Sequence, residues 1–445
     1  MPIVRRIVFL FALGFLGAMS FLLLTPRAGE VPATPPAPSN GSASQGVGKE
    51  SDPASPTTAP SDAGAVAWVA VGTPYPSTLE RPPTADDGQS KLWFHDGEWW
   101  GVLVDPSSGA TRIHWLNREA RTWVDTGVQV DERAASRADV LWDGEHLYVA
   151  TGGRAAAAEE HVRLMRYSYD PVARIYGLDP EFPVQLTTGG VRALTMAKDT
   201  AEVVWVTYIA DGRLWFTHSR ETDVAWDVPA TLPVEGASVG QDVAVLARNG
   251  GSIAVVWTNQ ADGAVYASSH LDGDEPASWS PTTVALQGQQ LADNHLSARG
   301  LDGADGSSLH VVVKTSLDVL PNSTPTDVQM LLLTLRPDGT WESNVFGRLA
   351  DRHTRPLLLV DDEQRQLYIF AVSPFGGGSV YFKRTSADEI ALPPGKGAPM
   401  LSLPQQPGIT SPTSTKQAVT EESGIVVLAS DQETGRYVFG RLRTE

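Results

Sequence analysis

Basic side chains recur at one place in a repeated sequence pattern. Seven short apolar runs follow one another along the chain, and the residue 9 to 14 positions before each of the last six is usually basic. These positions hold Arg137, Arg192, Gln241, His295, Arg355 and Lys416, and Lys91 stands near the first run. If the repeats surround an axis, these residues surround one opening. Because like charges around a funnel repel one another until an anion neutralises them, we predict an anion-binding funnel. Its binding residues are expected to be Arg137, Arg192, His295, Arg355 and Lys416.

A structural role for the same residues is an open alternative. The start of an inner strand lies at a solvent-exposed rim, where an arginine can pair with a neighbouring carboxylate. Asp139, Asp242 and Asp351 are near enough in the sequence to serve. Both interpretations remain open from the sequence.

The composition excludes several other kinds of site. There is no cysteine, which removes disulfides, thiolate metal sites and a cysteine nucleophile. The nine histidines show no close pair with metal-ligand spacing, so we expect neither a metal nor a cofactor. With 52 acidic and 34 basic residues the formal net charge is -18, which opposes attraction to nucleic acid.

Short β-strands are the elements that would position the funnel. Beyond residue 66 the sequence alternates apolar and polar residues in short runs separated by Gly, Asp and Asn turns, which predicts an all-β fold. The apolar runs begin at Trp100, Leu147, Val203, Ile253, Leu309, Leu367 and Ile425. A period near 50 residues is typical of β-propeller blades, each a four-stranded sheet buried by its neighbours. We predict seven blades, with six blades and an extra hairpin as the alternative.

The last blade has only three strands before the chain ends. They are expected at residues 414–420, 425–430 and 436–442. The apolar segment at 66–71 is expected to supply the fourth strand and close the ring, because closure removes the exposed edges of an open sheet.

Two turns carry a recognisable motif. In the third and fourth repeats, residues 217–226 and 268–279 place Ser, Asp and Trp in an order that resembles the Asp-box turn, Ser-x-Asp-x-Gly-x-x-Trp, of the sialidase-like (BNR) propellers. The first copy lacks the Gly, and the second has extra residues before its Trp. The resemblance implies a propeller whose Asp-box turns are structural.

The same resemblance implies a possible chemistry. In sialidases three arginines hold the carboxylate of sialic acid, a Tyr paired with a Glu is the nucleophile, and an Asp is the acid and base. This sequence has no Arg-Ile-Pro motif and no identifiable Tyr and Glu pair. Tyr437 and Asp139 are only guesses, so the catalytic residues remain unknown.

The first 65 residues are expected to lie outside the propeller. Residues 7–24 are an uninterrupted apolar run that would span about 27 Å as a helix. Arg5 and Arg6 precede it, so the positive-inside rule places everything after it outside the membrane, whether it is a retained anchor or a cleaved signal peptide. Residues 25–65, rich in Pro, Ala, Ser and Thr, are predicted to be a disordered stalk. The expected domains are therefore 1–24, 25–65 and a propeller at 66–445.

These features together predict an exported, membrane-tethered propeller that acts as a binding module. Its partner is expected to be a glycan, another anionic ligand or a surface protein. A sialidase-like glycoside hydrolase is the first alternative, and a cell-envelope assembly scaffold is the second.

Overall fold

The computed structural model describes residues 66–85, 88–134, 136–374, 377–404 and 408–444. The chain divides into units Met1–Pro60 and Ser61–Glu445, and all described residues belong to the second. The predicted membrane helix at 7–24 and stalk at 25–65 lie outside the described residues. Within the described ranges, no helix is long and apolar enough to cross a membrane.

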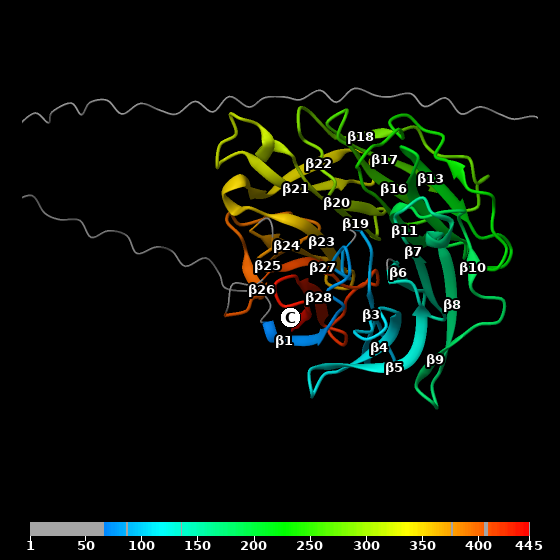
Figure 1. The fold of residues 1–445 in the computed structure, drawn as a ribbon. Helices are drawn as coiled ribbons and strands as arrows, with labels where there is room; N and C mark the ends of the chain where they lie inside the picture. The colour runs from blue at the N-terminus through cyan, green and yellow to red at the C-terminus, as the bar shows by residue number, and fades with distance from the viewer. Residues whose placement is uncertain (1–65, 86–87, 135, 375–376, 405–407, 445) are drawn as a thin grey trace, which may run out of the picture. The chain divides into compact units, whose positions relative to one another are not determined.

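Seven antiparallel sheets follow one another along the chain as the blades of a propeller (Figure 1). Inner strands contact one another in chain order from β2 through β6, β11, β15, β19 and β23 to β27. The backbone N–H of Leu92, at the start of β2, donates to the carbonyl of Ser414 just after β27, which joins the last blade to the first. The predicted all-β fold with seven blades is confirmed, and the six-bladed alternative is wrong.

The strands of each blade run from the axis outward, except where noted. Blade 1 comprises β2 (Leu92–His95), β3 (Glu98–Val104), β4 (Thr111–Asn117) and β5 (Thr122–Asp131). Blade 2 comprises β6 (Arg137–Trp142), β7 (Leu147–Gly152) and β8 (Arg163–Asp170), with β9 (Ile175–Leu178) and β10 (Val184–Gln185) both pairing with β8, and the 3-10 helix η1 (Ala158–Glu160) before β8. Blade 3 comprises β11 (Arg192–Lys198), β12 (Val204–Ala210), β13 (Arg213–His218) and β14 (Ala230–Thr231). Blade 4 comprises β15 (Ala244–Arg248), β16 (Ser252–Asn259), β17 (Ala264–Leu271) and β18 (Thr283–Gln287).

The remaining three blades complete the ring. Blade 5 comprises β19 (Leu296–Leu301), β20 (Ser308–Lys314), β21 (Val328–Leu335) and β22 (Trp341–Arg348), with η2 (Leu317–Val319) and η3 (Leu349–Asp351) in its loops. Blade 6 comprises β23 (Thr354–Asp361), β24 (Gln366–Ser373), β25 (Ser379–Ser386) and β26 (Ala398–Leu401). Blade 7 comprises β27 (Ile409–Thr413), β28 (Ile425–Asp431), β29 (Arg436–Leu442) and, outermost, β1 (Val66–Pro74).

Blade 7 is assembled from both ends of the described chain. Strand β1 pairs antiparallel with β29, with Val69 opposite Gly440, and blue β1 lies beside the red C-terminal strands in Figure 1. The closing strand expected at 66–71 is therefore confirmed. The inner strand of this blade was expected at 414–420, and this was wrong, because β27 lies at Ile409–Thr413. The ladder breaks register between Thr410 and Thr413, around a proline that cannot donate a ladder hydrogen bond.

Apolar side chains fill the spaces between blades. Trp93 and Trp100 of blade 1 pack with Tyr167 of blade 2, and all three are buried. On the other side of blade 1, Trp99 packs with Phe439 of blade 7. Burying an aromatic ring contributes about 1.5–3 kcal/mol relative to leaving it exposed, so these contacts hold the ring closed in a chain without disulfides.

Residues 88–91, which directly precede β2, lie on the propeller axis. The Gln89 side chain donates to the Leu194 carbonyl of blade 3 at 3.0 Å, and its own carbonyl accepts from Thr413 of blade 7 at 3.1 Å. Gly88 has a φ of +81°, and a Cβ there would lie 2.3 Å from Cγ2 of Val245, so a larger residue would clash with blade 4. Residues 88–91 thus occupy the axis and separate its two ends.

Candidate functional site

A cavity of about 610 Å³ lies at the end of the axis where the inner strands begin, and we call it the axial cavity. Its walls hold four arginines, Arg81, Arg154, Arg192 and Arg355, together with His295 and Lys314. Its carboxylates are Asp242, Asp293 and Asp318. The cavity volume is in the range of small-molecule binding sites.

The structure brings together three of the five residues predicted for the funnel. Arg192, His295 and Arg355 all line the axial cavity. Arg137 is buried beside it, where its guanidinium donates to the carbonyls of Arg81 at 2.8 Å and Ser136 at 2.7 Å. Lys416 lies beyond the segment on the axis and lines a different cavity of about 470 Å³ at the opposite end. The binding role of these residues stays a prediction.

Breaks in the inner strands shape the mouth of the axial cavity. Strands β11, β23 and β27 each lose register near their first residues. At these breaks Ala193, Arg355 and Ser411 adopt φ values of 49°, 52° and 52°, and all three line the cavity. A non-glycine residue in this left-handed region costs on the order of 1–3 kcal/mol, and such bulges re-aim side chains near functional sites.

Two of the cavity's arginines have no carboxylate partner among the residues that the structure describes. The Arg355 side chain makes no hydrogen bond or ion pair with another described residue. Within the described part of the chain, the only hydrogen bond of the Arg192 side chain is a 3.3 Å contact with the Gly240 carbonyl. The carboxylate of the buried Asp242 is engaged by the backbone instead: it accepts hydrogen bonds from the N–H of Gly240 at 2.8 Å and of Gln260 at 2.9 Å. Among the described residues, Arg192 and Arg355 therefore carry positive charge that no carboxylate neutralises.

Asp293 organises the other basic residues of the cavity. Its carboxylate accepts from the His295 imidazole and pairs with Lys314 at 2.7 Å. Burial raises the pKa of the Asp293 carboxyl, but the hydrogen bond from His295 and the charge and hydrogen bond of Lys314 outweigh it and hold that pKa well below its usual range. Asp293 is therefore ionised at neutral pH and fixes the orientation of the imidazole through Nδ1.

The two residues considered as catalytic candidates have structural contacts elsewhere. Asp139 is fully buried on the axis, where it accepts from the backbone N–H groups of Ser90 and Met196 at 2.8 Å and pairs with Lys416. Tyr437 is 1% exposed, and its hydroxyl accepts the Val104 N–H at 3.0 Å. Neither residue lines the axial cavity.

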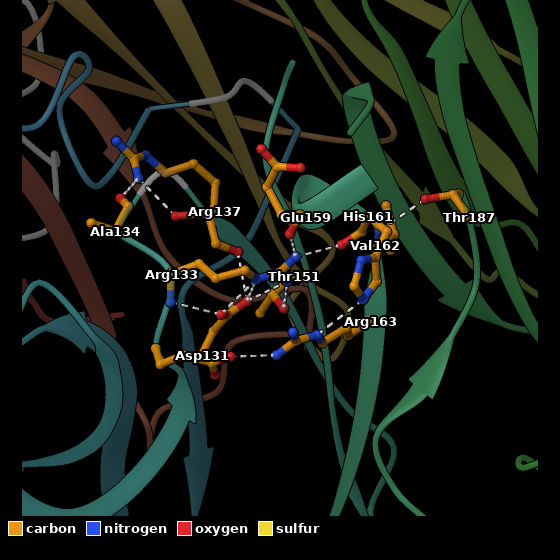
Figure 2. A network of polar contacts seen from close by, with 12 residues as sticks. Asp131, Arg133, Ala134, Arg137, Thr151, Glu159, His161, Val162, Arg163 and Thr187 are labelled. Atoms are coloured by element: carbon orange, nitrogen blue, oxygen red, sulfur yellow. Dashed lines mark hydrogen bonds and ion pairs between the residues drawn. The ribbon is translucent and has the colours of Figure 1, made fainter. Parts of the chain in front are cut away.

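Arg81 and Arg154 were missed by the sequence analysis because neither occupies the repeat position 9 to 14 residues before an apolar run. Arg81 is in the connection from β1 to β2, and Arg154 is in the loop between β7 and η1. Figure 2 shows how the base of that loop is held: Arg133 pairs with Asp131 and donates to the carbonyls of Glu159 and His161, each at 2.8 Å. The proximity of Arg154 to the axis thus depends on contacts that no repeat pattern records.

The first turn resembling an Asp-box links two blades. Ser219 bridges to Trp226, and the Trp226 indole donates to the Asp223 carbonyl at 2.6 Å. The Asp223 carboxylate in turn accepts from Tyr148 at 2.7 Å and Arg166 at 2.8 Å, both in blade 2. The turn therefore stabilises the contact between blades 2 and 3. Among the described residues, no group of three or more His, Asp or Glu side chains is placed to hold a metal ion.

Comparison with known proteins gives a likeness in fold. No protein-family model and no curated protein matches the sequence. The chain is similar to a solved polysaccharide lyase of family PL25, an ulvan lyase, with a TM-score of 0.54 and 12% identity over 85% of this chain and 96% of that chain. Such a lyase bound to -[GlcA(1-4)Rha3S]- gives a TM-score of 0.53 and 12% identity over 81% and 96%. The NanB sialidase from Streptococcus pneumoniae reaches 0.34 and 11% identity over 65% and 48%. The lyase similarity supports the propeller fold alone.

Proposed function

We propose that this chain is an exported, membrane-tethered β-propeller that binds a carboxylate-bearing glycan in its axial cavity. The observation that carries the proposal is the pair Arg192 and Arg355, two guanidinium groups in one cavity without a carboxylate partner among the described residues. A guanidinium group can bind a carboxylate through two parallel hydrogen bonds. In a chain with a net charge of -18, this local excess of positive charge favours an anionic ligand.

Two further observations support a glycan and export. Two solved structures with TM-scores above 0.5 are polysaccharide lyases, one of them bound to a glucuronate-containing saccharide. Export and tethering are inferred from the basic and apolar sequence at residues 5–24. A surface protein that presents such a glycan is a compatible partner.

The test is calorimetric titration of the full chain with glucuronate, N-acetylneuraminate, hyaluronan tetrasaccharide and sialyllactose, with lactose as the uncharged comparison. We expect at least one acidic glycan to bind and lactose not to bind. Arg355→Ala and Arg192→Ala should each weaken binding by about 10- to 100-fold, since a charged hydrogen bond contributes about 1.5–3 kcal/mol. Arg352→Ala is the matched control, because Arg352 is exposed and does not line the cavity. The proposal fails if no acidic glycan binds or if Arg355→Ala binds as the wild type does.

A lyase is a second candidate function, favoured by His295. Its imidazole is held by an ionised carboxylate in the same cavity as the two arginines. With a uronate carboxylate neutralised by arginine, the imidazole would take the proton from C5, the C4–O bond would break, C4 and C5 would become doubly bonded, and water would protonate the leaving oxygen. Ultraviolet absorbance of the unsaturated product, present with the wild type and lost in His295→Gln, would establish this reaction. If a uronate binds but the absorbance does not change, the chain is a binding module and not a lyase. The described residues that line the axial cavity include no Tyr or Glu, which disfavours the sialidase alternative.

A further inference from the structure

We infer that the axial cavity is one subsite of a longer groove, which takes an oligosaccharide with an acidic sugar on the axis and an uncharged sugar stacked between blades 2 and 3. This inference rests on the proposed function and adds the class of glycan. A second cavity, of about 800 Å³, opens beside the axial cavity, and we call it the blade groove. Arg154, Arg192 and Gln241 line both cavities, so the two are adjacent.

The blade groove has an aromatic wall. Tyr208 in β12 and Trp215 in β13 stand opposite each other in the ladder, and their rings are parallel to within 1° with centroids 6.4 Å apart. The Trp215 indole donates to the Ala210 carbonyl at 3.1 Å, which fixes its ring, and the ring is only partly buried. A fixed, flat apolar surface suits the C–H face of a pyranose ring, because the sugar can bury that face while its hydroxyls stay in water.

Charge along the groove distinguishes its two ends. The arginines Arg154 and Arg192 lie where the blade groove meets the axial cavity, and the only carboxylate among the described residues that line the blade groove is the exposed Asp211. A second acidic sugar beside Asp211 would be repelled, whereas an uncharged sugar would not. The groove therefore favours a glycan in which acidic and uncharged sugars alternate.

A loop held by backbone hydrogen bonds, residues 189–191, forms part of the wall of the blade groove. The backbone N–H of Gly190 donates to Ala155 at 3.0 Å, and that of Val191 donates to Gly153 at 2.8 Å. A Cβ on Gly190 would lie 2.2 Å from the Ala155 carbonyl oxygen, so only glycine allows this approach. Because the loop after β7 and the segment just before β11 hold each other here, the wall is formed before a ligand arrives, which reduces the entropy lost on binding.

The test compares glucuronate with hyaluronan tetrasaccharide, which alternates glucuronate and an uncharged sugar, by calorimetry on the full chain. We expect the tetrasaccharide to bind at least about 10-fold more tightly than glucuronate, equivalent to about 1.4 kcal/mol. Thr188→Trp should remove this advantage and leave glucuronate binding unchanged, because Thr188 is exposed and its new ring would fill the blade groove. Trp215→Ala should act in the same way, with Trp215→Phe retaining part of the advantage. Arg355→Ala should weaken the binding of both ligands.

Thr222→Trp is the matched control, since Thr222 is exposed and lies outside both cavities. Because Trp215 also packs against the core of blades 2 and 3, thermal unfolding of each variant is compared with that of the wild type, and Thr188→Trp decides the result if Trp215→Ala does not fold. If glucuronate binds but the tetrasaccharide binds no more tightly and is unaffected by Thr188→Trp, the extended groove is refuted and the proposed function stands. If neither saccharide binds, the extended groove is refuted, and the proposed function is refuted with it only if N-acetylneuraminate and sialyllactose do not bind either.

Discussion

Lys416 contributes to the stability of the ring through a contact that its position in the repeat does not reveal. It pairs with Asp139 and donates to the Met196 carbonyl, and the two charged side chains are 9% and 0% exposed. Burial lowers the pKa of Lys416, against the attraction of Asp139. A charge that remains buried after its partner is removed is strongly destabilising.

Lys416→Met should therefore lower the free energy of unfolding by about 3 kcal/mol, at the lower end of the usual range because Asp139 keeps two backbone donors. Urea denaturation measures the loss. Combining Lys416→Met with Asp139→Asn should recover part of it, since no lone charge is then buried. Unchanged stability with weakened glycan binding would instead support the binding role predicted from the sequence.

His353 should make stability depend on pH. Its imidazole is buried, with Nε2 3.1 Å from the Lys396 carbonyl, and burial lowers its pKa to about 4 from an ordinary 6.5. Between these two values the unfolded chain binds a proton that the folded chain does not, so stability falls as the pH falls through this window. The contribution of this one group is at most about 3 kcal/mol.

The measurement is urea denaturation of the wild type and His353→Gln at pH 7 and at pH 5. Glutamine can still donate to the Lys396 carbonyl but does not titrate, so the variant should lose less stability on acidification than the wild type. Equal losses in the two proteins would show that His353 does not contribute.

At the scale of elements, the closing strand is the part most open to test. Strand β1 covers β29, and Trp68 packs edge-on against Phe439 with centroids 5.7 Å apart. A chain that begins at residue 75 would leave β29 as an unpaired edge and uncover this aromatic contact. We expect a lower melting temperature and concentration-dependent aggregation, compared with a control chain that begins at Ser61 and keeps β1. Equal melting temperatures for the two chains would mean that β1 does not stabilise the ring.

The inner strands show which local signals the sequence carries. Pro356 and Pro412 directly follow Arg355 and Ser411, and a proline inside an inner strand is a recognisable sign of a bulge. Ala193 adopts the same left-handed conformation without a following proline, and nothing in its sequence neighbourhood indicates a bulge. The mouth of the axial cavity could therefore be inferred at two strands and not at the third.

At the scale of the whole molecule, the fold was predictable because each blade is specified by short sequence signals that recur along the chain. Each blade repeats alternation and turn residues, and closure follows from one orphan apolar segment. The candidate site was less predictable, because it depends on contacts between residues far apart in the sequence. Arg137 and Lys416 occupy the same repeat position as Arg192 and Arg355, yet their partners lie 56 and 277 residues away in the chain. The aromatic wall at Trp215 was also missed, because alternation identifies a strand but does not show which cavity its side chains line.

The net charge and the local charge of the site oppose each other, and the kinetics of binding should separate them. An approaching acidic glycan is repelled at long range by a chain with a net charge of -18, and is attracted by Arg192 and Arg355 only near the axial cavity. The Debye length falls from about 30 Å at 0.01 M salt to about 8 Å at 0.15 M, so added salt screens the distant repulsion first.

Stopped-flow measurements with labelled hyaluronan tetrasaccharide should show association that is as fast or faster at 0.15 M salt, while dissociation accelerates because contacts with the arginines weaken. Association that slows steeply with salt would mean that the basic mouth steers the ligand despite the net charge. Arg355→Ala should reduce the salt dependence of dissociation and leave that of association unchanged.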